Sequence, residues 1–309
     1  MISWFHRHGR THALAEMLGV DDRAIYPEVR IPRLRLLSTL LRYVLSTFLT
    51  TVALLRARRR DMTVIVVVPP VFPVLLARVL LKPSRLIVDA HSGAFVGKRW
   101  EWSVPLLRRS CRGIAALIVT NEELLQGEPV DCPVIVLHDP FEHWEETEPR
   151  EPAYVLVPLG GGDDEPVEAI VEALGASGLE IIISGIGYPS RLPENVRPVG
   201  FVSVEEYADL VRHATVMVGV TDEDFTMQRV GYEAMFAGKS LVTSDFPLLR
   251  RFFEDAAVYV QPRDSHSIAE GLAKAWQDAE RLAVRMREVR IARAREQESA
   301  MAELRRLMA

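Results

Sequence analysis

Glu233 and Arg229 are the two residues whose types and spacing most directly indicate chemistry. They lie four positions apart in a segment with helical character, so their side chains share one face of that helix. A surface ion pair would explain the spacing without any function. A carboxylate and a guanidinium near a helix start also suit a ligand that carries both hydroxyl and phosphate groups. The spacing alone leaves both interpretations open.

A loop around His91 is the second candidate. The preceding residues 85–89 are expected to form a buried strand, which places Asp89 at its end and His91 just beyond it. In open parallel sheets, ligands bind outside the carboxyl ends of the strands. In that position His91 can hydrogen-bond a substrate hydroxyl or orient an acceptor, while Asp89 fixes its tautomer or acts as a base. A structural histidine is the alternative.

The third candidate is the loop after the expected first strand, which contains His8, Arg10 and His12. The two histidines have the spacing of half a metal site, but no Asp, Glu or Cys nearby completes it, so we expect no metal. His8 and Arg10 are candidates for contact with an acceptor or a phosphate. A solvated loop followed by a helix cap is the alternative.

The elements that must position these residues alternate between strands and helices. This alternation predicts an α/β protein with parallel sheets. The expected strands cover residues 1–4, 23–26, 63–68, 85–89, 115–120 and 134–137, and then 153–158, 180–184, 196–202, 215–220, 240–243 and 257–260. A helix from about Thr226 to Ala237 is expected to carry Arg229 and Glu233.

The alternation is interrupted at residues 138–152, a stretch dense in acidic residues and proline that has the character of a linker. With 309 residues in total, the sequence predicts two domains, at residues 1–144 and 150–279. Each is expected to be a Rossmann-like, doubly wound parallel sheet, and the two domains to face each other across a cleft. Residues 280–309 are expected to form a helix that packs back on the first domain.

Composition excludes several classes of protein. A net charge of −5 gives no overall bias toward nucleic acid, and 49% apolar residues are enough for sizeable cores. The two cysteines, Cys111 and Cys132, form no disulfide framework, which fits a reducing, cytoplasmic setting.

Residues 34–58 are expected to form a long helix with an apolar stretch flanked by arginines. Its length nearly suits a bilayer, but Arg42 lies inside it, where a charge costs at least ~2.5 kcal/mol at mid-bilayer. The expected arrangement is a helix packed on a sheet. Peripheral contact with the inner face of a membrane through the flanking arginines is the alternative.

Residues 231–242, Gly-Tyr-Glu-Ala-Met-Phe-Ala-Gly-Lys-Ser-Leu-Val, resemble the Glu-Ala-x-Ala-x-Gly-x-Pro-Val signature of GT-B glycosyltransferases, especially the retaining family four. Residues 197–202, 207–214 and 245–250 are similar to neighbouring segments of that family. The resemblance is clearest over residues 154–279 and implies a GT-B fold.

The resemblance also implies a role for each matching residue. Glu233 would bind the ribose of a nucleotide sugar, and Arg229 with the helix start at Thr226 would lie near the diphosphate. The remaining donor-binding candidates are backbone positions and residues beside the base: Gly161, Gly162, Gly185, Phe201 and Val202.

Two departures from the family pattern stand out. The family has a second glutamate eight positions before the first, where this chain has Phe225, so Asp224 is the candidate replacement. The family also carries an Arg and a Lys after its glycine-rich loop, whereas Gly160 to Asp164 contain no cation.

The implied activity is transfer of a sugar from a nucleotide sugar to a hydroxyl of a glycan, a lipid-linked molecule or a small molecule. Retention of configuration and independence of metals and other cofactors are implied as well. The alternatives are a non-catalytic GT-B-like binding or regulatory subunit and a nucleotide-sugar epimerase of the same fold.

Overall fold

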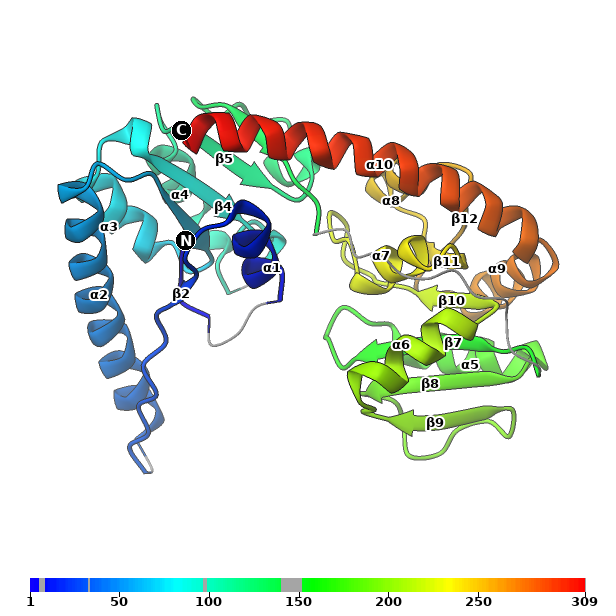
Figure 1. The fold of residues 1–309 in the computed structure, drawn as a ribbon. Coiled ribbons are helices and arrows are strands. Elements are labelled where there is room, and N and C mark those ends of the chain that lie inside the picture. Colours follow the sequence, from blue (N-terminus) through cyan, green and yellow to red (C-terminus); the bar gives the residue numbers. More distant parts are fainter. Residues whose placement is uncertain (6–8, 33, 97–98, 140–151, 309) are drawn as a thin grey trace. The chain divides into compact units, whose positions relative to one another are not determined.

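The computed structural model describes residues 1–5, 9–32, 34–96, 99–139 and 152–308. The chain forms two compact units, residues 1–140 with 297–309 and residues 141–296. Each unit is built on one six-stranded, fully parallel sheet (Figure 1). The predicted α/β class with two doubly wound parallel sheets is therefore confirmed.

The sheet of the first unit has the strand order β2-β1-β3-β4-β5-β6. Its strands are β1 (Ile2–Ser3), β2 (Arg23–Ala24), β3 (Val64–Val68), β4 (Leu86–Ala90), β5 (Ala116–Val119) and β6 (Val134–Val136). Every residue of the three central strands β3, β4 and β5 is buried, as expected of parallel strands that are covered by helices on both faces.

The α-helices of the first unit are α1 (Gly9–Leu18), α2 (Arg35–Arg59), α3 (Phe72–Leu80) and α4 (Val104–Ser110). One face of the sheet packs on α1 and on the end of α10 (Ala279–Met308), through a cluster that includes Leu14, Ile65, Met301 and Leu304. The C-terminal end of α10 is thus part of the core of the first unit.

The sheet of the second unit has the order β12-β11-β10-β7-β8-β9. Its strands are β7 (Val155–Gly160), β8 (Ile181–Ile186), β9 (Val196–Gly200), β10 (Val216–Gly219), β11 (Ser240–Ser244) and β12 (Ala257–Val260). The strand order reverses between β7 and β10, which are neighbours, so their carboxyl ends form a topological switch point.

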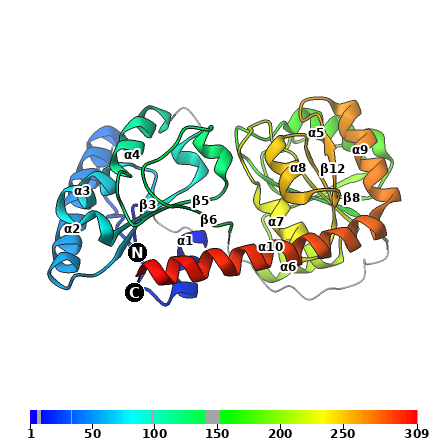
Figure 2. The ribbon, with the colours of Figure 1, turned by 90° about the horizontal axis from the view of Figure 1, so that it is seen from above.

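Helices cover both faces of this second sheet (Figure 2). α5 (Val167–Ser177) and α9 (Ser265–Gln277) pack on one face. α6 (Val204–His213), α7 (Arg229–Phe236), α8 (Pro247–Phe253) and the first half of α10 pack on the other.

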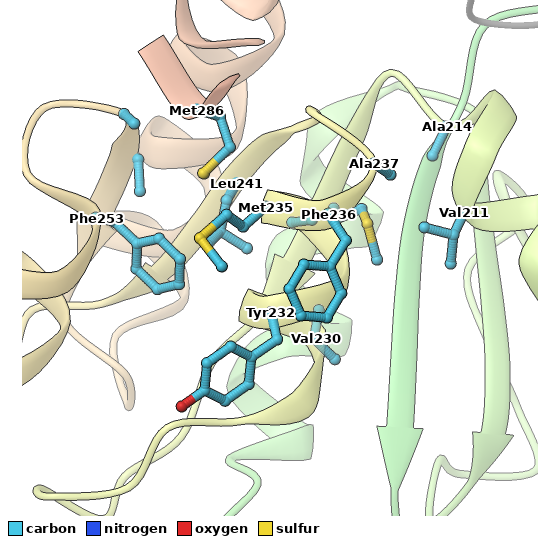
Figure 3. Packing of buried hydrophobic residues seen from close by; sticks show 14 of the residues in the cluster. Val211, Ala214, Val230, Tyr232, Met235, Phe236, Ala237, Leu241, Phe253 and Met286 are labelled. Carbon is cyan, nitrogen blue, oxygen red and sulfur yellow. The ribbon is translucent and has the colours of Figure 1, made fainter. Parts of the chain in front are cut away.

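α7 is anchored in the second core by its aromatic and methionine side chains. Tyr232, Met235 and Phe236 join Leu241 and Phe253 in one buried cluster (Figure 3). The ring of Tyr232 stacks on Phe236 at 6.2 Å between centroids. Because three of the eight helix residues are fixed in this way, the remaining side chains of α7 have a defined orientation.

α2 packs on the first unit through a narrow line of residues. It packs beside α3, but only Ser46, Thr50, Leu54 and Ala57 are buried on it. Of the most apolar 18-residue stretch of α2, 11% is buried. By length and composition, α2 is the one helix among the described residues that could cross a membrane. The helix therefore packs on the first unit along one line of residues, and most of its remaining surface is exposed.

Candidate functional site

A pocket of about 700 Å³ lies at the switch point of the second sheet. Its walls come from the ends of β7 and β8, from the loop between β9 and α6, and from the first turn of α7. Six of the residues expected to bind a donor line it: Gly162, Gly185, Phe201, Val202, Arg229 and Glu233. The structure thus brings together residues from four separate segments of the sequence.

Glu233 is the buried carboxylate of this pocket. Its side chain is 5% exposed, whereas that of Arg229 is 60% exposed. Arg229 Nε donates to Glu233 Oε1 at 2.8 Å, which confirms the shared helix face. A carboxylate with so little exposure is costly unless it is paired and hydrogen-bonded, so this pair differs from an ordinary surface ion pair.

Tyr207 completes the surroundings of Glu233. Its hydroxyl donates to Glu233 Oε2 at 2.5 Å from the neighbouring helix α6. Burial, and then the adjacent carboxylate, raise the pKa of Tyr207 above its ordinary value, so the hydroxyl stays a donor. No signal in the sequence pointed to Tyr207, because nothing in the local pattern links it to a residue on another helix.

The glycine-rich loop after β7 presents three backbone donors, and Glu165 accepts from all of them. The N–H groups of Gly160, Gly161 and Gly162 donate to the carboxylate of Glu165 at 2.8, 2.9 and 3.2 Å. Consecutive backbone N–H groups of this kind form a concave anion-binding site. The side chain of the chain's own Glu165 therefore lies where an external anion would bind.

Position 185 requires glycine because the backbone of β8 lies close to that of β7 there. Its φ is +89°, and a Cβ at this position would lie 1.8 Å from the carbonyl oxygen of Leu159 on β7. Any side chain would push apart β7 and β8, which form the floor of the pocket. Gly185 thus allows β7 and β8 to lie close together at the floor of the pocket.

Three of the expected site residues lie outside the described walls of this pocket: the donor-binding candidates Gly161 and Thr226, and Asp224, the candidate replacement for the missing glutamate. Phe225 adopts a left-handed backbone with φ of 63°, and Gln228 is extended, so α7 begins at Arg229 rather than near Thr226. The expected helix start at Thr226 is wrong. Asp224 Oδ1 accepts from the N–H of Phe225.

The acidic loop after β10 is tied to its neighbours by hydrogen bonds. Thr221 Oγ1 donates to Asp164 Oδ2 at 2.8 Å, and Thr221 N–H donates to Ser244 Oγ at 2.9 Å. Asp222 pairs with Arg263. Burial, and then the like charges of Asp164 and Asp222, raise the pKa of Glu223.

The first unit holds a separate cluster at the carboxyl end of β4. Asp89 is fully buried, its Oδ2 lies 3.1 Å from His91 Nε2, and its Oδ1 lies 3.4 Å from Arg10 Nη2. Burial opposes the ionised form, but Arg10 and His91 outweigh it and hold the pKa of Asp89 at about 2. The geometry fits the orienting role expected of Asp89, since a carboxylate with no exposed surface has no access to a substrate proton.

Arg10 is also turned inward. Besides Asp89, its guanidinium pairs with Asp139 at 3.0 Å and donates to the carbonyl of Leu137 at 2.8 Å. It is buried, so it neutralises this cluster instead of extending toward a phosphate as expected. The ring of His91 stacks on Phe5 at 6.1 Å between centroids. The expected role of His8 falls outside the described residues.

The C-terminal part of the chain matches a known family. Residues 165–309 match the family model described as "Glycosyl transferase-like". This match confirms the resemblance noted for residues 231–242. No curated protein sequence matches the chain significantly.

Solved structures match nearly the whole chain. Sucrose-phosphate synthase from Thermosynechococcus elongatus aligns with a TM-score of 0.68 at 16% identity, covering 93% of this chain and 82% of that one. HepE from Anabaena, in complex with UDP, aligns with a TM-score of 0.65 at 12% identity, covering 95% and 88%. A glycosyltransferase from Rickettsia africae aligns with a TM-score of 0.57 at 11% identity, covering 100% and 85%. At these identities the likeness establishes the fold, which is GT-B.

Proposed function

We propose that this chain, whose residues 165–309 carry a glycosyl transferase-like domain on a GT-B fold, transfers a sugar from a nucleotide sugar to an acceptor hydroxyl. The observation that carries the proposal is the buried carboxylate of Glu233, held between Arg229 and Tyr207 in the pocket at the switch point. HepE, one of the similar structures, is in complex with UDP-glucose.

The donor would occupy the pocket in a defined orientation. Glu233 accepts hydrogen bonds from the two ribose hydroxyls, since an ionised carboxylate offers about four lone-pair directions. Arg229 and the start of α7 lie close to the diphosphate. The ring of Phe201, which is 78% exposed beside the pocket, offers a surface against which the base can stack.

The proposed chemistry is metal-independent transfer with retention of configuration. The largest catalytic effect would be stabilisation of the departing diphosphate by Arg229 and the backbone donors of α7. In the first unit, His91, oriented by Asp89, would contact the acceptor. The proposed location is the cytoplasm, at the inner face of a membrane, and the exposed apolar surface of α2 supports the membrane contact.

A second candidate function is nucleotide binding without turnover. It is favoured by Glu165, whose carboxylate accepts from all three N–H groups of the glycine-rich loop. A chain that keeps this contact with a nucleotide bound would lack backbone donors to the diphosphate.

The test compares wild type with Glu233→Gln, using Glu205→Gln, at an exposed position of α6, as a control. Binding of UDP, GDP and ADP is measured by calorimetry, and hydrolysis or transfer is measured with their glucose conjugates. We expect Glu233→Gln to weaken nucleotide binding about tenfold or more. Unchanged binding in the variant would exclude Glu233 from the donor site. Tight binding without any turnover would favour the second function.

A further inference from the structure

The exposed face of α2 is apolar where a helix of a water-soluble protein is ordinarily polar. Its buried line consists mostly of small or hydroxyl-bearing residues, and its large apolar side chains point outward. The exposed ones between residues 34 and 55 are Leu34, Leu36, Leu37, Leu40, Leu41, Val44, Leu45, Phe48, Leu49 and Leu55. A patch of this extent marks a binding surface for an apolar partner.

Two adjoining hollows open beside this face. The outer one, of about 750 Å³, is a groove along α2 lined by Leu36, Leu40 and Val44 on one side and by Trp102 on the other. The inner one, of about 300 Å³, lies outside the carboxyl ends of β1 and β3. Both are lined by Tyr43, Arg99 and Trp100, so the groove and the inner cavity meet there.

A continuous series of aromatic rings lines the passage between the two hollows. Trp4, which follows β1, contacts Tyr43 at 5.6 Å between centroids, and Tyr43 contacts Phe72 at 5.6 Å. Phe72 contacts Trp100 at 6.1 Å, and Trp100 contacts Trp102 at 6.3 Å. Aromatic residues with one polar end suit the boundary between an apolar chain and a wet headgroup.

Two arginines face the inner cavity, Arg42 from α2 and Arg99 from the loop before α4. Arg42 donates to the hydroxyl of Tyr26 and lies 4.6 Å from the centre of that ring. Arg99 lies 5.8 Å from the ring of Trp100. Within the described parts of the chain, neither guanidinium forms an ion pair with a carboxylate. Two positive charges on one small cavity without acidic partners favour an anionic ligand, and guanidinium groups suit phosphate in particular.

We propose that this double hollow binds an amphiphile whose phosphate lies between Arg42 and Arg99 and whose apolar chain lies in the groove along α2. Among the described residues, both arginines line the inner cavity, whereas the groove is lined mainly by apolar side chains and has Arg99, at its junction with the cavity, as its one cation. The inner cavity is also lined by Phe5, whose ring stacks on His91. A group bonded to the phosphate thereby reaches the carboxyl edge of the first sheet, where ligands of such sheets bind.

The inference rests on the proposed function in one respect, that it names the acceptor as a phosphate-bearing lipid. Binding itself is independent of the sugar donor, since every residue of the double hollow belongs to the first unit. Flanking charge favours a lipid over a second copy of the chain. Arg35 precedes the apolar face and Arg56, Arg58 and Arg59 follow it, with no acidic residue in α2, so two copies would bring like charges together.

The test titrates the full-length protein with decyl phosphate, decanol and inorganic phosphate, below the concentration at which the first forms micelles. Calorimetry or the fluorescence of Trp100 and Trp102 reports binding. We expect decyl phosphate to bind at least about tenfold more tightly than either other ligand. Arg99→Gln, at an exposed position, and Arg42→Gln should each remove most of this preference and leave decanol binding unchanged. Arg58→Gln, on the same helix outside both hollows, should retain it.

Equal binding of decyl phosphate and decanol by wild type would overturn the proposal, and so would an unaltered preference in both cavity variants. Light scattering on the same samples provides a further criterion. A stable dimer that dissociates in Val44→Arg, together with no binding of decyl phosphate, would assign the face to a second copy. If UDP, GDP and ADP fail to bind but decyl phosphate binds, the proposed function is excluded and the phosphate-selective site remains. If the nucleotides bind and decyl phosphate shows no preference over decanol, the lipid site is excluded and the proposed function remains.

Discussion

The hydroxyl of Tyr207 donates a 2.5 Å hydrogen bond to Oε2 of Glu233, although the two residues are 26 positions apart and lie on different helices. The remaining carboxylate oxygen accepts from Arg229. The carboxylate is thus fixed from two sides before any ligand binds. A preorganised acceptor of this kind lowers the entropic cost of binding a diol.

Tyr207→Phe tests this preorganisation. We expect the KM for the nucleotide sugar to rise about tenfold, because one hydrogen bond to a charged group is lost. Tyr259→Phe is a matched control, since its hydroxyl donates to the backbone carbonyl of Glu254 in the same unit. An unchanged KM in Tyr207→Phe would mean that Arg229 alone orients Glu233.

The raised pKa of Tyr207 gives this contact a defined pH dependence. Exposed tyrosines ionise at about pH 10. The folded-state pKa lies above that value, so the neutral hydroxyl persists through this range, and its contribution is lost only at higher pH. We expect the KM of wild type to stay constant as pH rises toward 10.

Glu165→Gln tests whether the glycine-rich loop binds the diphosphate. The carboxylate of Glu165 accepts from three backbone N–H groups that a diphosphate would need. Removing its negative charge should raise the affinity for UDP or inorganic phosphate by about three- to tenfold. Glu168→Gln, in the first turn of α5, is the control. If UDP affinity falls or stays the same while folding is intact, the loop serves only to hold Glu165.

Asp89→Asn tests the buried cluster of the first unit. The substitution leaves the Arg10 guanidinium buried without one of its carboxylate partners, so the free energy of unfolding should fall by about 3 kcal/mol at neutral pH. The folded-state pKa of Asp89, at about 2, lies below its ordinary value. Its stabilising contribution is therefore complete above about pH 4 and is lost as pH falls through 2.

The difference in stability between wild type and Asp89→Asn should accordingly narrow between pH 4 and pH 2, as measured by urea denaturation. Asp61→Asn provides the comparison, because Asp61 pairs with Lys82 and Arg85 on the exposed surface. A difference that stays constant over this pH range would contradict the assigned titration.

Leu40→Glu combined with Val44→Glu tests membrane contact through α2. Both side chains are exposed on the apolar face, so the folded chain should tolerate the change. We expect wild type to float with vesicles of phosphatidylglycerol and phosphatidylcholine and the variant to lose at least about tenfold in affinity. Ile291→Glu, exposed on α10, should bind as wild type does. Raising the salt concentration should weaken the binding of wild type, because the flanking arginines contribute.

Local patterns in the sequence determined the framework of this protein. Within the described residues, runs of Val and Ile bounded by glycine or proline predicted the twelve strands to within about two residues. The shared face of Arg229 and Glu233 follows from helical geometry.

Tertiary structure alone decided which distant groups meet. Tyr207 reaches Glu233, and Arg10 turns inward toward Asp89, because strand order and helix packing bring these segments together. Periodicity also showed that α2 is apolar but not which of its faces is buried. In the folded chain α2 packs beside α3, and apart from Leu54 its leucines are exposed. Local structure depends on residues that are close in the sequence, whereas contacts between residues far apart in the sequence form only when the whole chain folds.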